Sequence, residues 1–228
     1  MDARARKIRN RLSPADRRAQ LIGCSIRALA AHGVARATHA HVADRAGVSV
    51  AAVHSYFRTR HDLIEATLAT VASLLLRITA EVAARKLPAR ESLALMAAGF
   101  DAAARRDPDV VKVWLDWSTG FRAEVWPSYL EMQERALADV RSALTRGKRR
   151  GELSARLNVK AAARLFVGGG RTIALARFSG AGEREIAVLI HHLVLGVTSI
   201  GLTAVADSPP PGTDTGTHNQ DLSRKRPA

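Results

Sequence analysis

The stretch HVADRAGVSVAAVHSYF, residues 41–57, constrains the fold of this chain more than any other feature. Two short amphipathic segments flank a Gly-Val-Ser, with the spacing that two steeply crossed helices require. Ala43 is small enough for close helix contact, Gly47 tolerates a positive φ at the turn, and Val53 supplies a branched apolar side chain for the shared core. This spacing predicts a helix-turn-helix, with an ordinary helical hairpin in a bundle as the alternative.

Helix-start and helix-stop residues divide most of the chain into further helices. Ser13, Thr38 and Ser49 are suited to cap helix N-termini, and Gly33 and Gly47 are suited to end helices. No stretch shows the alternating pattern of a strand, so we expect an all-α fold. Helices are predicted over 14–32, 39–46, 50–56, 60–85, 90–105, 108–119, 122–150, 158–178 and 183–205.

Positive charge is concentrated at the N-terminal end of the chain. Residues 1–60 contain 12 Lys and Arg residues but only 3 acidic ones, a net +9 of the +14 that the whole chain carries. A basic end next to a helix-turn-helix indicates a surface for a polyanion, and the second helix of such a motif can enter the DNA major groove. The alternative is a generally arginine-rich chain whose solvated faces are basic.

The pattern divides the chain into four parts. We expect a basic flexible arm over 1–14, a helix-turn-helix domain over 15–60, a helical domain over 61–206 and a disordered Pro/Gly/Thr-rich tail over 207–228. Cys24 is the only cysteine and fits an apolar helical pattern, so no disulfide framework is expected. With no signal-peptide core and no charge-free membrane-length apolar run, we expect a soluble cytoplasmic protein that does not enter a membrane.

Enzymatic and metal chemistry find no support in the pattern. His39 and His41 are too close in sequence for a usual helical zinc pair, and His191 and His192 point apart on a helix. The sequence has no Gly-rich phosphate loop after a strand and no Gly-x-Ser-x-Gly. We therefore expect no catalytic residues, no metal site and no cofactor.

The block from Arg17 to Leu63, with THAHVADRAGVSVAAVHSYFRTRHDL, resembles the DNA-binding domain of the TetR family of transcriptional regulators. The segments RNRLSP, VSVAAVHSYFRTRHDL and VKVWLDWSTGFRAEVWP resemble one branch, the LuxR/HapR/SmcR group of quorum-sensing master regulators. The resemblance covers about residues 9–205. It implies three N-terminal helices that bind DNA, a long fourth helix, and a helical C-terminal domain for dimerisation and ligand binding.

The resemblance also implies which residues meet DNA. Arg9 and Arg11 match an arm that reaches the minor groove, a region whose negative potential suits arginine. The group usually has Asn at the position of Ser55 and an aromatic residue at that of His54, so the operator sequence is not expected to carry over. Relatives generally have Lys at the position of Arg60. The predicted DNA-binding residues are Arg9, Arg11, Thr38, Ser49, Val50, Ala51, Ala52, His54, Ser55, Tyr56 and Arg60.

A small-molecule pocket in the C-terminal domain is the second implication. The three tryptophans of the chain, Trp114, Trp117 and Trp126, lie within thirteen residues and either line a cavity or pack as core. Trp114 matches the pocket of the group directly, whereas the other positions differ from the group's usual Phe, Phe, Asn and Cys. The predicted ligand-binding residues are Leu75, Ile78, Trp114, Gln133 and Gly170.

The glycines of Phe166-Val-Gly-Gly-Gly-Arg171 suggest close helix approach, room in the pocket or a local kink. The resemblance implies that helices 158–178 and 183–205 form a four-helix dimer interface with those of a second copy, as the family does. An apolar stripe on both faces of 186–202 supports this expectation, because a monomer would leave one face exposed. A fully buried central helix is the alternative. The functional hypotheses are a dimeric, sequence-specific regulator on a palindromic operator, with or without a small effector and quorum-sensing control, and a basic architectural DNA binder with little sequence preference.

Overall fold

The computed structural model describes residues 12–121 and 123–199 and is helical throughout these ranges. Arg9, Arg11 and the predicted tail over 207–228 lie outside the described residues. The helices are α1 Pro14–His32, α2 His39–Ala46, α3 Val50–His54, α4 Arg60–Ala84, α5 Ala89–Arg106, α6 Pro108–Trp117, α7 Trp126–Arg149, α8 Val159–Phe178 and α9 Glu183–Ser199. The all-α expectation is confirmed over this part of the chain.

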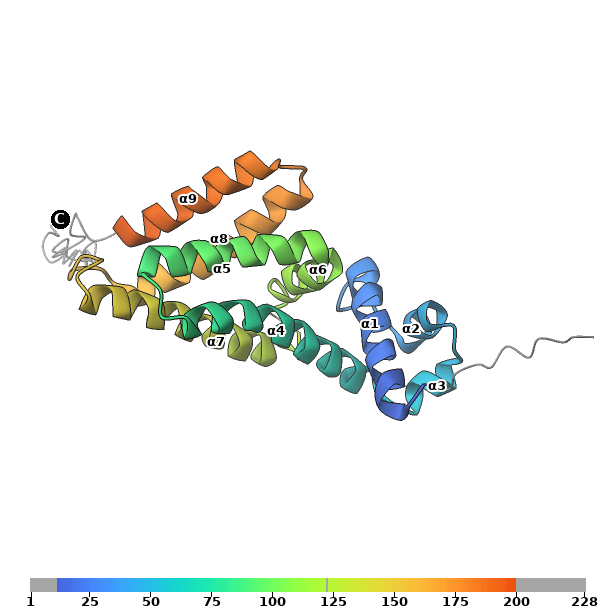
Figure 1. Ribbon diagram of the computed structural model, residues 1–228. Helices are drawn as coiled ribbons and strands as arrows, with labels where there is room; N and C mark the ends of the chain where they lie inside the picture. The colour runs from blue at the N-terminus through green and yellow to red at the C-terminus, as the bar shows by residue number, and fades with distance from the viewer. Residues whose placement is uncertain (1–11, 122, 200–228) are drawn as a thin grey trace, which may run out of the picture.

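The helices form an elongated molecule with two unequal parts (Figure 1). The helices α1 to α3 lie together at one end, and α4 runs from them along the larger body. In that body α7 packs against α4 and α8, while α9 packs against α5 and α8. Helix α4 is long and apolar enough to cross a membrane by length and composition, but it packs against α1, α5, α6 and α7, as a core helix does.

The predicted capping residues set the starts of the first helices. The Ser13 hydroxyl accepts from the backbone N–H of Asp16 at 3.1 Å, and Thr38 and Ser49 accept in the same way at α2 and α3. Thr59 and Asp62 form a reciprocal capping box at the start of α4. These bonds satisfy N–H groups that have no partner within the helix, which fixes where each helix begins.

Several helix ends differ from the sequence prediction. Helix α3 ends at His54, two residues early, because the N–H of Tyr56 bonds to the Val53 carbonyl in a tighter turn. Helix α7 starts at Trp126 instead of residue 122, and Pro127 lies in its first turn, where a missing N–H costs nothing. Helix α9 is described as far as Ser199, so the predicted end at residue 205 lies outside the described residues.

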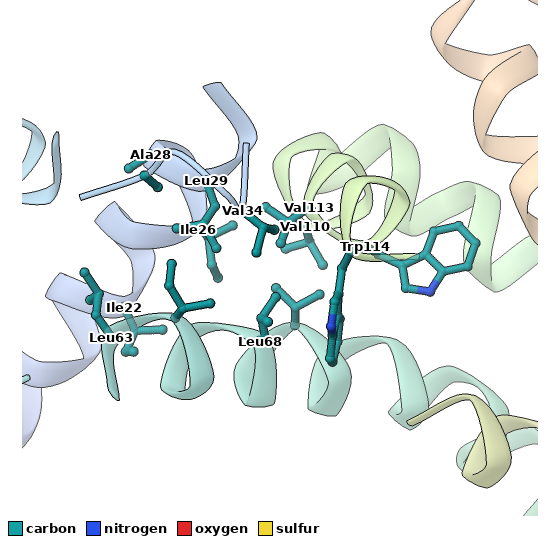
Figure 2. Close-up of a cluster of buried hydrophobic side chains, with 14 of the residues drawn as sticks. Ile22, Ile26, Ala28, Leu29, Val34, Leu63, Leu68, Val110, Val113 and Trp114 are labelled. Atoms are coloured by element: carbon teal, nitrogen blue, oxygen red, sulfur yellow. The ribbon is translucent and has the colours of Figure 1, made fainter. Parts of the chain in front are cut away.

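Two apolar cores run through the described chain. The first contains α1 to α3 together with parts of α4, α6 and α7, and the second joins α5, α7, α8 and α9 with the end of α4. Figure 2 shows part of the first core, where side chains of α1, α4 and α6 meet. The boundary predicted at residue 60 therefore falls within the first core, which contains residues from both sides of it. The labelled residues in Figure 2 are Ile22, Ile26, Ala28, Leu29, Val34, Leu63, Leu68, Val110, Val113 and Trp114.

Candidate nucleic-acid interface and ligand cavity

The helices α2 and α3 have the geometry that their sequence spacing predicted. Gly47 ends α2 with φ 64° and ψ 38°, the left-handed conformation that glycine adopts without a Cβ penalty. Ala43 and Val53 are both buried, at 1% and 0% exposure, between the two helices and α1. The pair is therefore a helix-turn-helix with a closed core.

The N-terminal part of α3 projects away from that core. Ser49, Val50 and Ala51 are exposed and Ala52 is half-buried, whereas the next residue, Val53, is fully buried. Small side chains in this order leave the helix surface open to close approach by another molecule. These four residues were predicted to contact DNA, and each of them is at least partly accessible.

The C-terminal end of α3 is held by polar contacts. The Ser55 hydroxyl donates to the Ala52 carbonyl at 2.8 Å. The His54 ring stacks on that of His39 with centroids 3.9 Å apart, and Nε2 of His39 lies 2.9 Å from the Phe57 carbonyl. Sequence analysis gave His39 no role; here it supports the helix that carries the candidate DNA contacts.

Arg60 has a structural role that sequence analysis did not foresee. Its guanidinium donates to three backbone carbonyl groups: that of Val34 at 2.6 Å, that of Ala35 at 2.7 Å and that of Ala37 at 2.8 Å. It thereby ties the start of α4 to the turn between α1 and α2. A phosphate contact by Arg60 stays a prediction, but most of its donors are already committed to the protein backbone.

Other arginines surround α2 and α3 with exposed positive charge. Arg18 lies over the Phe57 ring, with its guanidinium carbon 5.2 Å from the ring centroid, and Arg36, Arg45 and Arg58 are exposed. The basic N-terminal composition had indicated such a surface without singling out these residues. Tyr56 and Thr38, two further predicted contacts, are half-buried at its edge.

A second histidine stack joins α1 to α2. The rings of His32 and His41 lie 3.9 Å apart with an interplanar angle of 14°, and Nδ1 of His41 is buried with no hydrogen-bond partner among the described residues. Desolvation lowers the pKa of His32 below its ordinary value, and the neighbouring His41, Arg45 and Arg36 lower that pKa further. The surroundings of His32 therefore favour its uncharged imidazole.

The larger body contains an apolar cavity of about 90 Å³ between α4, α5, α7 and α8. Leu75, Trp114, Gln133 and Gly170, four of the five predicted ligand residues, line it. Ile78 is not among the lining residues, because its side chain packs against Gly99 and faces a groove between α4 and α5. On a helix, Ile78 lies three residues from Leu75, and a small difference in rotation turns it out of the cavity. Ligand binding by any of the five stays a prediction.

Few polar groups reach the cavity, and none of the residues that line it is charged. The Gln133 amide nitrogen lies 3.5 Å from the Tyr129 hydroxyl, and burial raises the pKa of that phenol, which keeps it protonated. Thr79 supplies a third polar group. The apolar side chains that line the rest of the cavity were not predicted, because in a helical pattern they look like ordinary core residues. They include Met96, Phe100, Met132, Phe166 and Leu193.

The three consecutive glycines of α8 face three different surroundings. A Cβ on Gly169 would lie 2.4 Å from Leu193 of α9, so this glycine permits close helix approach. A Cβ on Gly170 would lie 3.8 Å from Phe100, at the cavity, and one on Gly168 would meet nothing within 4 Å. The assigned helix continues through all three. Close approach and room at the cavity, both predicted, therefore belong to different glycines.

Helix α6 connects the cavity with the helix-turn-helix. Trp114 lines the cavity, and two residues later the Asp116 carboxylate accepts from the backbone N–H of Val34 at 2.7 Å. Trp117 is buried and donates from Nε1 to the Val125 carbonyl at 2.9 Å, and Trp126 stacks on Tyr129. Of the three tryptophans, one lines the cavity and the other two pack around it.

Helices α8 and α9 leave apolar side chains uncovered. Leu165, Leu175 and Phe178 of α8 and Val188 and Leu195 of α9 are exposed by between 37% and 52%. Leu165, Gly168 and Leu175 are three and seven residues apart, which aligns them on one face of α8. No group of three or more metal-ligating side chains occurs in the part of the chain that the structure describes.

Comparison with known proteins agrees with this architecture. Residues 23–67 match the model of the bacterial regulatory proteins of the tetR family. The chain is 32% identical over 168 residues to the HTH-type transcriptional regulator LuxR of Vibrio harveyi, covering 74% of this chain and 82% of that protein. It is 36% identical over 142 residues to the HTH-type transcriptional regulator BetI of Burkholderia ambifaria, covering 59% and 73%.

A TetR-like transcriptional regulator from Rhodococcus sp. RHA1 has the same fold, with a TM-score of 0.66 and 20% identity over 82% of this chain and 98% of that one. The fold, the helix-turn-helix geometry and the extended similarity to LuxR agree with one another. The chain belongs to the TetR family of helix-turn-helix transcriptional regulators.

Proposed function

We propose that this regulator binds double-stranded DNA as a homodimer and recognises a palindromic operator. The observation that carries the proposal is the outward presentation of α3, whose Ser49–Ala52 surface is accessible while Val53 anchors the helix. A helix held in this way can enter a major groove with its N-terminal residues at the base edges. Surrounding arginines supply the attraction to phosphate that such an encounter needs.

The homodimer is proposed from the uncovered apolar side chains of α8 and α9. A monomer would leave these side chains in water, and a second copy could bury them in a two-fold interface. Two-fold symmetry would then place two α3 helices on half-sites about one helical turn apart. The operator would mirror that symmetry as a palindrome.

The individual DNA contacts remain part of the proposal. Arg9 and Arg11 would follow the minor groove, and Ser55 and His54 would read different bases from those read by the LuxR group. Quorum-sensing control is proposed from the resemblance to that group, and the protein would act in the cytoplasm, at the chromosome. A family of transcriptional regulators gives no reason to propose an enzymatic activity.

A small effector in the cavity would regulate DNA binding through α6 and α4. A ligand against Trp114 would move α6, and Asp116 on the same helix holds the turn between α1 and α2 through Val34. Arg60 ties the start of α4 to that same turn. A ligand that favours one arrangement of these contacts would shift the population of DNA-competent dimers.

The experiment that tests the proposal is selection of bound sequences from a random DNA pool at physiological salt. The full-length protein is compared with a variant carrying Arg9→Ala, Arg11→Ala and Ser55→Ala. Arg149→Ala, an exposed arginine at the far end of α7, is the matched control. We expect a palindromic motif from the wild type and the control, and a degraded motif from the triple variant.

The competing hypothesis is a basic architectural DNA binder with little sequence preference. It is kept because the accessible surface of α3 consists of small, uncharged side chains that offer few hydrogen bonds to bases. Selection without an enriched motif, together with binding that simply disappears as salt rises, would support this alternative and reject the specific regulator.

A further inference from the structure

A groove on the outside of the larger body runs between α4 and α7. Its volume is about 740 Å³, and small side chains line much of it. The groove is lined by residues of α4 and α7 and by Trp117 of α6, and no residue of α8 or α9 lines it. None of the predicted DNA-binding residues that the structure describes and none of the exposed apolar side chains of α8 and α9 lines it. The small residues are Ala69, Ala72, Ser73, Ala80 and Ala138.

Only one layer of side chains separates this groove from the apolar cavity. Leu76 and Met132 line both spaces. Beside them a hydrogen bond crosses the layer, because Thr79 lines the cavity, Asp139 lines the groove, and the Thr79 hydroxyl donates to the Asp139 carboxylate at 2.6 Å. Leucine and methionine side chains change rotamer readily, so this layer can open without moving a helix.

The charged side chains of the groove favour a cation. Glu65, Glu131 and Asp139 bring three carboxylates, against Arg77 and Arg135. Arg77 already pairs with Glu81 outside the groove, with nitrogen and oxygen 3.7 Å apart. The carboxylate nearest the cavity is that of Asp139, and no residue that lines the cavity is basic. An anionic head group beside Asp139 would therefore meet a like charge, whereas an ammonium group there would meet an opposite one.

The size and character of the cavity limit the rest of the ligand. About 90 Å³ is smaller than the ~150 Å³ of an engineered apolar cavity that binds benzene. The cavity thus accepts an alkyl group of about five carbon atoms, whose burial releases water from apolar surface. A polar end attached to that group would reach the layer of Leu76, Met132 and Thr79.

We propose that the cavity is filled from the groove between α4 and α7, and that its ligand is a small amphipathic amine whose ammonium group binds Asp139. The alkyl group passes Leu76 and Met132 into the cavity, and the ammonium group replaces or joins the Thr79 hydroxyl as donor to the carboxylate. This inference rests on the proposed function, because it identifies the chemical class of the effector that the cavity would bind.

The test uses three probes with the same 3-methylbutyl group and different head groups: isopentylamine, isopentanol and 4-methylpentanoate. Each is titrated calorimetrically into the full-length protein at pH 7. We expect isopentylamine to bind about tenfold tighter than the other two, because a half-buried carboxylate attracts an ammonium group more than a hydroxyl or a second carboxylate. Gly170→Ala, whose added Cβ makes ordinary contacts at 3.8–3.9 Å with Phe100 and Trp114, should weaken all three.

Asp139→Asn is the decisive variant, since it removes the charge and still accepts from Thr79. We expect it to abolish the preference for the amine. Glu134→Gln is the matched control: Glu134 lies on the same helix, pairs with Arg141 at 2.6 Å and does not line the groove. The control changes the net charge by the same amount but leaves the lining of the groove unchanged. It should therefore bind the amine as the wild type does.

Equal affinity for the three probes, tighter binding of 4-methylpentanoate, an unchanged preference in Asp139→Asn, or binding of none of them would overturn the inference. The same preparation is used for DNA selection, which separates the two proposals. A protein that selects a palindrome but fails the probe test remains a DNA-binding regulator with a different effector. A protein that binds the amine and selects no motif loses the proposed DNA function instead.

Discussion

Two stacked histidine pairs lie within the helix-turn-helix domain. His32 stacks on His41 between α1 and α2, and His39 stacks on His54 between α2 and α3. Parallel imidazole rings 3.9 Å apart attract one another when neutral and repel when both carry a proton. Of these histidines, His32 has a pKa that is lowered by desolvation and by the neighbouring His41, Arg45 and Arg36.

The stability of the protein should fall as pH drops below about 6.5, the ordinary pKa of histidine. The pKa of His32 is lowered in the folded state, mainly by desolvation, so below this pH the unfolded chain binds more protons than the folded one. The contribution of His32 is present in full above that pH and is lost as pH falls through the lowered pKa. His32→Phe keeps an aromatic ring against His41 and should reduce the slope.

The measurement is the melting temperature between pH 8 and pH 5.5 for the wild type and His32→Phe. His61→Gln is the control, because His61 is exposed and lies 3.6 Å from Glu124 instead of in a stack. A wild-type slope that His32→Phe leaves unchanged would show that the His32–His41 stack does not carry the pH dependence.

Helical glycines show how tightly the elements pack against one another. Gly147 of α7 is buried, and a Cβ added to it would lie 2.5 Å from the Cβ of Ala89 at the start of α5. The Ala89 Cβ is attached directly to the backbone and cannot rotate away. Gly23 of α1 is the opposite case, since its added Cβ would come no closer than 3.9 Å to the end of the Arg27 side chain.

Gly147→Ala should destabilise the protein by about 1–3 kcal/mol, the usual cost of overpacking. Gly23→Ala should stabilise it by about 0.5–1 kcal/mol, because alanine is the better helix former and the space is open. Urea unfolding of both variants checks the pair. A free energy of unfolding for Gly147→Ala equal to or above that of the wild type would contradict the close contact between α7 and α5.

Local elements were predictable from sequence because their causes are local. The caps Ser13, Thr38 and Ser49 and the turn at Gly47 act within three or four residues, so the starts of α1 to α3 were predicted correctly. Four of the five residues that the resemblance to a known family suggested as ligand contacts are among those that line the cavity.

Contacts between distant segments were not predictable in this way. The three carbonyl groups that Arg60 binds lie at least 23 residues away, and the bond between Thr79 and Asp139 spans 60 residues. Whether Ile78 faces the cavity depends on the rotation of α4 against α5, which no local pattern determines. The groove between α4 and α7 arises only when both helices are packed.

Shared packing connects the helix-turn-helix, the apolar cavity and the uncovered faces of α8 and α9. One apolar core joins the helix-turn-helix to α6, and Asp116 and Arg60 both hold the turn between α1 and α2. The cavity is lined by Trp114, two residues before Asp116 on α6, and the uncovered apolar side chains lie on α8 and α9. This arrangement supports the proposed coupling of ligand binding, dimerisation and DNA binding, because the three sites lie on helices that pack against one another.

The central claim is that two copies, joined through α8 and α9, recognise a palindrome. Leu175→Glu with Leu195→Glu would place charges on the two apolar helix faces and should produce monomers. Leu130→Glu, an exposed leucine on α7, is the control for adding charge to an apolar surface. The monomeric variant should lose its preference for the palindrome, because a single α3 reads only a half-site.

The most direct measurement is the affinity for the selected palindrome and for a scrambled duplex of equal length, by fluorescence anisotropy over a range of salt concentrations. We predict that the wild type and Leu130→Glu prefer the palindrome by about a thousandfold or more, and that the preference persists while both affinities fall with salt. The monomeric variant should bind both duplexes almost equally. Equal affinities of the wild type for the two duplexes, falling in parallel as salt rises, would contradict the claim.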